Sequence, residues 1–220
     1  MTNSLIPNRF LFRFSLPCLH CERLWAPSGG AGLDERFRLA NFSELEGRSA
    51  FAEVRAAWNP SGLAFSVYVT GKRQAPWCRP SKPEDSDCFQ VWIDTRDVHN
   101  VHRASRYCHR LIFLPAGEGR NLEEPFAMCL PINRAKEQSR PISPKQLSVI
   151  SKLQKDGYLL EANIPADALT GFDPQEHPRL GFTYAVIDRE LGEQTLTVGS
   201  PLPYQEDPSL WATLELTKSE

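Results

Sequence analysis

Apolar and polar residues alternate in short segments along most of this chain, and that alternation constrains the fold more than any other feature. It is clearest in residues 63–70, 158–164 and 180–186. A period of two places successive side chains on opposite faces of a β-strand, so one face of each segment is expected to lie in a core. The interior residues predicted in this way are Phe65, Val67, Val69, Phe89, Val91, Ile93, Leu160, Ala162, Phe182 and Tyr184.

Turn residues separate these segments. Asn59-Pro60-Ser61-Gly62 lies between residues 51–58 and 63–70, and Lys155-Asp156-Gly157 precedes residues 158–164. Proline fixes φ and an Asp-Gly pair favours a tight reversal, so both sites predict β-hairpins. We expect about nine to eleven strands in an all-β, two-sheet antiparallel β-sandwich of jelly-roll or immunoglobulin-like type, with minor short helices.

The 220 residues are expected to form a single domain, residues 1–220. Residues 1–50 are interpreted as an N-terminal strand, in which Phe10, Phe12, Phe14 and Leu16 alternate, and an irregular lead-in. Arginines and prolines interrupt this segment, which disfavours a signal peptide, and no apolar run approaches the roughly 20 residues of a membrane helix. The sequence leaves the compartment open and favours a cytoplasmic location only slightly over export.

The charge and the cysteine content limit the classes of partner and of metal or redox site that the sequence favours. The net charge is −2, with 24% charged residues, so neither nucleic acid nor a membrane surface is expected as a partner. Six cysteines in a chain of this length predict free thiols. Residues 18–21, Cys-Leu-His-Cys, have the spacing of a metal knuckle or a redox pair, but no second motif of this kind accompanies them.

Most of the polar chemistry lies in residues 85–115. Two strand candidates, residues 89–94 and 107–114, flank a polar connection. In the first of them Gln90, Trp92 and Asp94 alternate with apolar residues and are expected to face away from the core. Together with Arg110 on the second strand they predict a binding surface.

Histidines in the connection suggest a metal site, because imidazole and carboxylate at short spacing bind metals. His99, His102 and His109 lie near Asp94 and Asp97, but their spacing fits no metal motif. The alternative is that they hydrogen-bond the turn and its carboxylates. Catalytic motifs are absent from the sequence and no pair of carboxylates stands out, so an enzyme is the weaker hypothesis.

Two regions outside the strands are harder to interpret. Residues 71–86 are rich in Lys, Arg and Pro and carry Trp77, which either covers the core or serves as a ligand platform. The loop sequence slightly favours the interpretation in which Trp77 covers the core. Residues 116–140 are predicted to be a long irregular excursion, and residues 195–199 a further short strand.

Five segments in order share one further pattern. They are Ala57-Trp-Asn-Pro-Ser-Gly-Leu63, Asp87-Cys-Phe-Gln-Val-Trp-Ile-Asp94, Gly157-Tyr-Leu-Leu-Glu-Ala-Asn-Ile-Pro165, Leu180-Gly-Phe182 with Asp188, and Asp207-Pro-Ser-Leu-Trp211. Their order over residues 51–216 resembles the family 9 carbohydrate-binding modules and their DOMON-like relatives. The resemblance implies a β-sandwich that binds a sugar or glycan end, often attached to a glycoside hydrolase and often with structural calcium.

In that family two aromatic rings sandwich one sugar while polar side chains bind its hydroxyl groups. Trp77 and Tyr204 match the rings, and Gln90 and Arg110 match the polar residues. Gln90 replaces the usual Glu, and Tyr204 lies one residue out of register. The secondary ligand-binding candidates are Trp92, Arg96, His99, His102 and His109.

The function expected is therefore carbohydrate binding by an aromatic clamp, with a glycoside hydrolase as a candidate partner. One alternative is a glycoside-processing enzyme or its non-catalytic accessory subunit. The other is a metal-binding or haem-binding DOMON-like domain, although Met128 is the only internal methionine for haem. No cofactor is expected to be required, and calcium would have a structural role.

Overall fold

Strands and short 3-10 helices make up the regular structure. The computed structural model describes residues 8–26 and 29–218, and within these ranges no helix exceeds four residues. The strands are β1 (Ser15–His20), β2 (Ala52–Asn59), β3 (Gly62–Thr70), β4 (Cys88–Asp94), β5 (Cys108–Glu118), β6 (Glu124–Leu130), β7 (Ser148–Gln154), β8 (Gly157–Pro165), β9 (Arg179–Asp188), β10 (Gly192–Thr195) and β11 (Ala212–Thr217). The 3-10 helices are η1 (Asn8–Leu11), η2 (Glu35–Phe37), η3 (Ser43–Glu46), η4 (Pro83–Asp85), η5 (Pro144–Gln146), η6 (Ala166–Ala168) and η7 (Pro208–Leu210).

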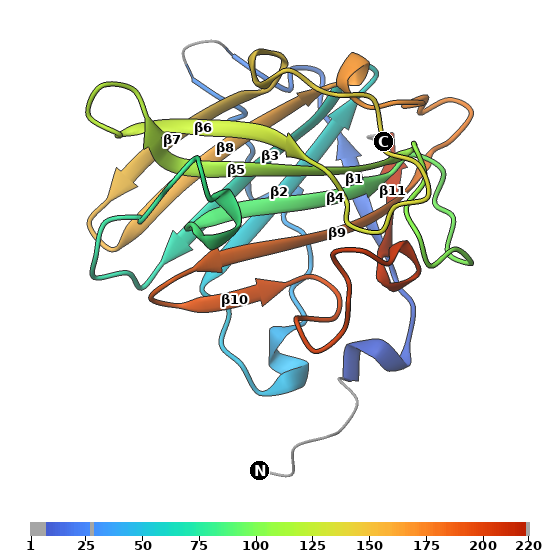
Figure 1. Cartoon of the computed structure of the whole chain (residues 1–220), viewed down its shortest axis with the longest axis horizontal. Coiled ribbons are helices and arrows are strands. Elements are labelled where there is room, and N and C mark those ends of the chain that lie inside the picture. Colours follow the sequence, from blue (N-terminus) through green and yellow to red (C-terminus); the bar gives the residue numbers. More distant parts are fainter. Residues whose placement is uncertain (1–7, 27–28, 219–220) are drawn as a thin grey trace.

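The strands form two facing layers, which confirms the all-β sandwich (Figure 1). Hydrogen bonds run in the order β6-β5-β4-β9-β11-β1-β2-β3-β8-β7, with β10 on β9. The pairing differs from the predicted two-sheet antiparallel layout at one strand. β1 pairs in parallel with both β11 and β2, so it links the layers into one continuous ladder.

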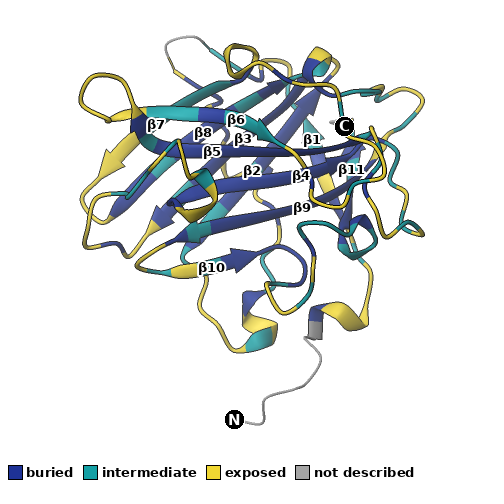
Figure 2. Cartoon of the chain, in the orientation of Figure 1, coloured by how far each residue is buried: buried dark blue, intermediate teal, exposed yellow. Residues whose placement is uncertain are grey.

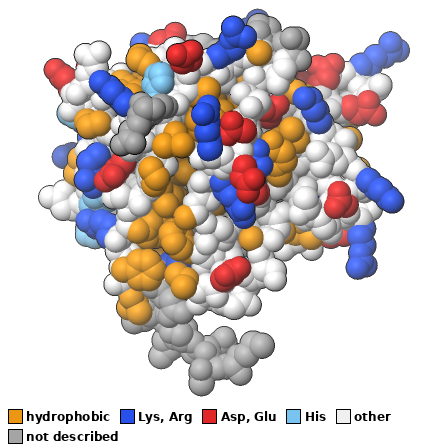
Figure 3. Space-filling model, turned by 180° about the vertical axis from the view of Figure 1, so that it is seen from behind, with side chains coloured by type: hydrophobic (Ala, Val, Ile, Leu, Met, Phe, Trp, Pro, Cys, Tyr) orange, Lys and Arg blue, Asp and Glu red, His pale blue; other side chains and the backbone are white. Residues whose placement is uncertain are grey.

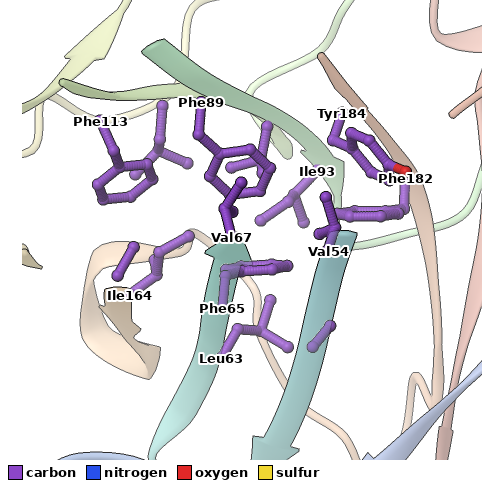
Figure 4. Close-up of a cluster of buried hydrophobic side chains, with 14 of the residues drawn as sticks. Val54, Leu63, Phe65, Val67, Phe89, Ile93, Phe113, Ile164, Phe182 and Tyr184 are labelled. Atoms are coloured by element: carbon purple, nitrogen blue, oxygen red, sulfur yellow. The ribbon is translucent and has the colours of Figure 1, made fainter. Parts of the chain in front are cut away.

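The core lies between these layers (Figure 4). All ten residues predicted for the interior are buried in it. Phe65 of β3 contacts two rings of the opposite layer, Phe89 at 5.5 Å and Phe182 at 6.0 Å between centroids. Facing aromatic rings of this kind bury much apolar area, so the period of two identified the inner face of each strand correctly.

Both predicted hairpins are present, but Gly157 has another role than expected. The reversal is made by Lys155 and Asp156, and Gly157 already belongs to β8. A Cβ atom at Gly157 would lie 1.8 Å from the carbonyl oxygen of Val69. Glycine is therefore required here for the close approach of β8 to β3.

Three strand predictions are corrected. Phe10 belongs to η1 and Phe12 and Phe14 precede β1, so the N-terminal strand begins only at Ser15. β6 occupies part of the predicted irregular excursion. It is an edge strand, half-buried on both faces, and therefore shows no clean alternation. A further short strand was predicted at residues 195–199. The strand found there, β10, instead ends at Thr195.

Burial of the outer face of β4 and β5 is the largest departure from the sequence-based prediction (Figure 2). Gln90, Trp92 and Asp94 were expected to face outward, yet they are 1%, 0% and 2% exposed. Residues distant in sequence cover this face and form a second apolar cluster. We call it the outer-face cluster, and it contains Trp92, Ala104, Cys108, Ile132, Ala185, Val198, Tyr204 and Trp211.

The rear surface carries a strip of apolar side chains among charges of both signs (Figure 3). Phe10, Leu11 and Phe12 are among the exposed large hydrophobic residues. Within residues 8–26 and 29–218, no helix has the length and apolar character needed to cross a membrane.

Candidate functional site

Arg110 lies at the centre of the predicted polar site. It pairs with Trp92 across β4 and β5, and its side chain is 3% exposed. Its Nη2 and Nε donate to Oε1 of Gln90 at 2.8 and 3.3 Å, and its Nη1 contacts a carboxylate oxygen of Glu84 at 2.8 Å. The guanidinium carbon lies 5.3 Å from the centroid of the Trp92 ring. Gln90 and Arg110 therefore form one hydrogen-bonded polar unit.

Glu84 was not identified from the sequence. It belongs to η4 in the loop before β4, and its side chain is 58% exposed. The loop is rich in charged residues, and no pattern distinguishes Glu84 from its neighbours. Only the tertiary structure brings this carboxylate over the buried guanidinium.

Trp77 lies in the same loop and is half-buried. The guanidinium carbons of Arg189 and Arg79 lie 4.1 and 5.0 Å from the centroid of its ring. A pocket of about 280 Å³ borders the indole and is lined by Lys72, Gln74, Ala75, Trp77, Asp87, Arg189 and Glu190. Trp77 thus borders a small opening, with arginine side chains packed over its ring.

A buried ion triad holds the base of this loop. Nζ of Lys72 contacts Asp87 at 2.9 Å and Asp188 at 2.5 Å, and all three side chains are at most 3% exposed. Asp87 also accepts a hydrogen bond from the backbone N–H of Trp77 at 3.0 Å. The triad therefore fixes the backbone at Trp77 relative to the ends of β4 and β9.

Tyr204 packs inside the outer-face cluster. It is 1% exposed, and its ring meets Trp92 edge-on at 5.2 Å. Its hydroxyl donates to Glu193 at 2.8 Å, and burial raises its pKa. The two predicted clamp residues contact different neighbours, and Tyr204 offers no exposed ring face. An open clamp between Trp77 and Tyr204 is not formed in this structure.

Most of the secondary candidate residues make hydrogen bonds or ion pairs in and around the loop after β4. Arg96 donates to the backbone carbonyl groups of Thr95 at 3.0 Å and Gly171 at 2.6 Å. Nε2 of His99 lies 2.7 Å from Asp97, and Nδ1 of His102 lies 3.1 Å from Asp207. These contacts match the alternative in which the loop residues bind the turn and nearby carboxylates. Trp92 is fully buried.

In residues 8–26 and 29–218, no group of three His, Cys, Asp or Glu side chains is arranged to hold a metal ion. The carboxylate pair Asp87 and Asp188 does not fit structural calcium, because the ammonium group of Lys72 lies between them. All six cysteines are free thiols, as predicted.

His109 is buried and is expected to make the protein sensitive to acid. It is 0% exposed, and its Nε2 accepts the backbone N–H of Thr170 at 3.0 Å. Burial lowers the pKa of His109 from 6.5 to about 4. The unfolded chain therefore binds more protons between these values, so the free energy of unfolding falls by about 3 kcal/mol as the pH drops through this window.

Urea denaturation at pH 7 and pH 4.5 tests this expectation. His109→Gln retains an acceptor for Thr170 and should flatten the pH dependence. His102→Gln, at a side chain that is 77% exposed, is the matched control and should leave the dependence unchanged. Identical pH profiles for His109→Gln and the parent protein would contradict the role of His109.

Comparison with solved structures gives the class of fold. The chain is similar to a family 9 carbohydrate-binding module from Caldicellulosiruptor kristjanssonii, solved with cellotriose, at a TM-score of 0.61 and 13% identity over 94% of this chain and 95% of the other. The match to a family 9 module from that organism solved with glucose has a TM-score of 0.60, 12% identity, and coverage of 94% and 97%. A third neighbour, from Bacteroides uniformis, has a TM-score of 0.55, 12% identity, and coverage of 94% and 100%.

These matches extend over nearly the whole chain, residues of the N-terminal lead-in included. No protein-family model matches the sequence, and no curated protein matches it significantly. The chain has the β-sandwich fold of the family 9 carbohydrate-binding modules, in agreement with the resemblance of its sequence segments.

Proposed function

We propose that this protein is a carbohydrate-binding module whose site lies between Trp77 and Arg110. The observation that carries the proposal is the buried Gln90–Arg110 unit beside the Trp77 loop, on a fold shared with modules solved with cellotriose and glucose. An amide and a guanidinium supply hydrogen-bond partners for sugar hydroxyl groups. An indole ring supplies a flat apolar surface for the C–H face of a sugar.

In this proposal Tyr204 is not the second ring that contacts the sugar. Tyr204 supports Trp92, which in turn lies under Arg110, so Tyr204 acts behind the site. Arg79 and Arg189 must leave the Trp77 ring before a sugar can stack there. Both arginines are exposed, so their side chains can move into solvent without disturbing the core.

Isothermal titration calorimetry with glucose and cellotriose tests the proposal. Trp77→Ala should remove most of the affinity, because the stacking surface is lost. Arg110→Lys should weaken binding by about 1–3 kcal/mol, because lysine cannot reproduce the bidentate hydrogen bonds to Gln90 and the sugar.

Trp25→Ala is the matched control for Trp77→Ala. Trp25 is also half-buried but belongs to the apolar cluster on the outer face of β2 and β3. The Trp25→Ala variant should bind sugar with the same affinity as the parent protein. A folded protein that binds no member of a broad glycan array would contradict the proposed function.

A further inference from the structure

Charge balance at Arg110 bears on which sugar the site accepts. The guanidinium is nearly enclosed, with a side-chain exposure of 3%. Its partner Gln90 is uncharged, so the hydrogen bonds at 2.8 and 3.3 Å satisfy donors without neutralising the positive charge. A buried guanidinium requires a compensating anion, because an uncompensated charge in such a place is strongly destabilising.

Glu84 supplies that anion. Among the residues described, it is the one carboxylate within 4.0 Å of the Arg110 guanidinium, at 2.8 Å. Glu193 makes no ion pair with Arg110 within 4.0 Å, and its carboxylate accepts the hydroxyl of Tyr204 at 2.8 Å. The positive charge of Arg110 is therefore neutralised by a side chain that reaches in from the solvent side.

Glu84 is placed so that it can leave. Its side chain is 58% exposed, while the loop that carries it is anchored elsewhere. The backbone N–H of Asp87 donates to Trp77 at 2.9 Å, and the hydroxyl of Ser86 accepts the backbone N–H of Arg79 at 2.8 Å. Rotation of Glu84 into water breaks none of these hydrogen bonds.

The departure of Glu84 has different consequences for neutral and acidic sugars. A neutral sugar in its place would leave the buried charge of Arg110 without a counter-ion. A carboxylate would restore both the charge balance and a charge-assisted hydrogen bond.

We infer that the site prefers a sugar bearing a carboxylate, a uronic acid residue, and that Glu84 occupies the position of this carboxylate when no ligand is bound. The inference rests on the proposed carbohydrate-binding function and specifies its ligand. Glu84 acts as an internal competitor that a uronate displaces.

Titration calorimetry of the full chain with sodium D-glucuronate, D-glucose and sodium acetate at one ionic strength tests the inference. The parent protein should bind glucuronate at least tenfold more tightly than glucose. Glu84→Gln should tighten glucuronate binding at least another tenfold, because the competitor and its repulsion are removed, and should not tighten glucose binding. Without ligand, the melting temperature of Glu84→Gln should be lower than that of the parent protein, and addition of glucuronate should raise it.

Glu123→Gln is the control for net charge, since Glu123 is an exposed carboxylate in the connection from β5 to β6. It should behave as the parent protein does. Acetate binding as tight as glucuronate binding would overturn the inference, because the site would then recognise a bare carboxylate. Glucose binding equal to or tighter than glucuronate binding would also overturn it while leaving the carbohydrate-binding function intact. Binding of no sugar by the parent protein or by Glu84→Gln would overturn both.

Discussion

Replacement of Lys72 with methionine is expected to lower the free energy of unfolding by about 3–5 kcal/mol at neutral pH. The ammonium group contacts Asp87 and Asp188, which are 1% and 2% exposed. Methionine fills a similar volume but leaves two buried carboxylates without a counter-charge. Chemical denaturation measures the loss, and we expect the backbone of the Trp77 loop to become less ordered at the same time, because Asp87 also binds the N–H of Trp77.

The pH dependence gives a second test of the triad. Burial acts to lower the pKa of Lys72, but the hydrogen bonds to Asp188 and Asp87 outweigh it and raise the pKa above its ordinary value. The stabilisation from the charged form is therefore complete below the ordinary pKa and is lost as the pH rises through the raised pKa. Above neutral pH, the difference in the free energy of unfolding between the parent protein and Lys72→Met should narrow only as the pH rises through this raised pKa.

Two further variants isolate the effect of charge. Lys152→Met changes an exposed lysine on β7 and should be nearly neutral. Adding Asp188→Asn to Lys72→Met should recover part of the stability, because one uncompensated charge is removed. If Lys72→Met unfolds at the same denaturant concentration as the parent protein, the triad does not stabilise the fold.

Replacement of Trp92 with alanine should also cost about 3–5 kcal/mol, because it opens a cavity in the outer-face cluster. Trp92 is 0% exposed and lies between the Tyr204 ring at 5.2 Å and the Arg110 guanidinium at 5.3 Å. Loss of this ring removes the support for both neighbours, so sugar binding should weaken as well.

Trp92→Phe should be much less costly. Within the part of the chain that is described, the indole N–H of Trp92 has no hydrogen-bond partner. Trp92→Phe therefore loses side-chain volume but no hydrogen bond. Urea denaturation of both variants gives the comparison, with Trp25→Ala as the half-buried control. A loss below about 1 kcal/mol for Trp92→Ala would show that the outer-face cluster is not a packed core.

One loop links stability and function in this protein. It carries Trp77 and Glu84, and it is anchored through Asp87 by the buried ammonium of Lys72. The opposite wall of the proposed site, Gln90 and Arg110, belongs to paired strands. The proposed exchange of Glu84 for a ligand requires an exposed carboxylate paired with a buried guanidinium, and Glu84 and Arg110 form such a pair.

Period-two alternation predicted most of the strands and the core, because the face of a strand that a side chain occupies is a local property. Turn residues predicted both hairpins, whereas β6 and the start of β1 were missed. Phe65 and Phe182 meet across the core even though many residues separate them in the chain. The sequence also placed Gln90 and Arg110 on two neighbouring strands, and these strands are the antiparallel pair β4 and β5.

Whether the opposite face of β4 is covered depends on residues far away in sequence, and the tertiary structure alone decided it. Tyr204 packs on Trp92 across more than one hundred positions, and Lys72 reaches Asp188 over a similar separation. Alternation shows which side chains turn away from the core, but it carries no information about what lies on the other side. For the same reason Glu84 could not be recognised, because its role is created by the buried charge that it neutralises.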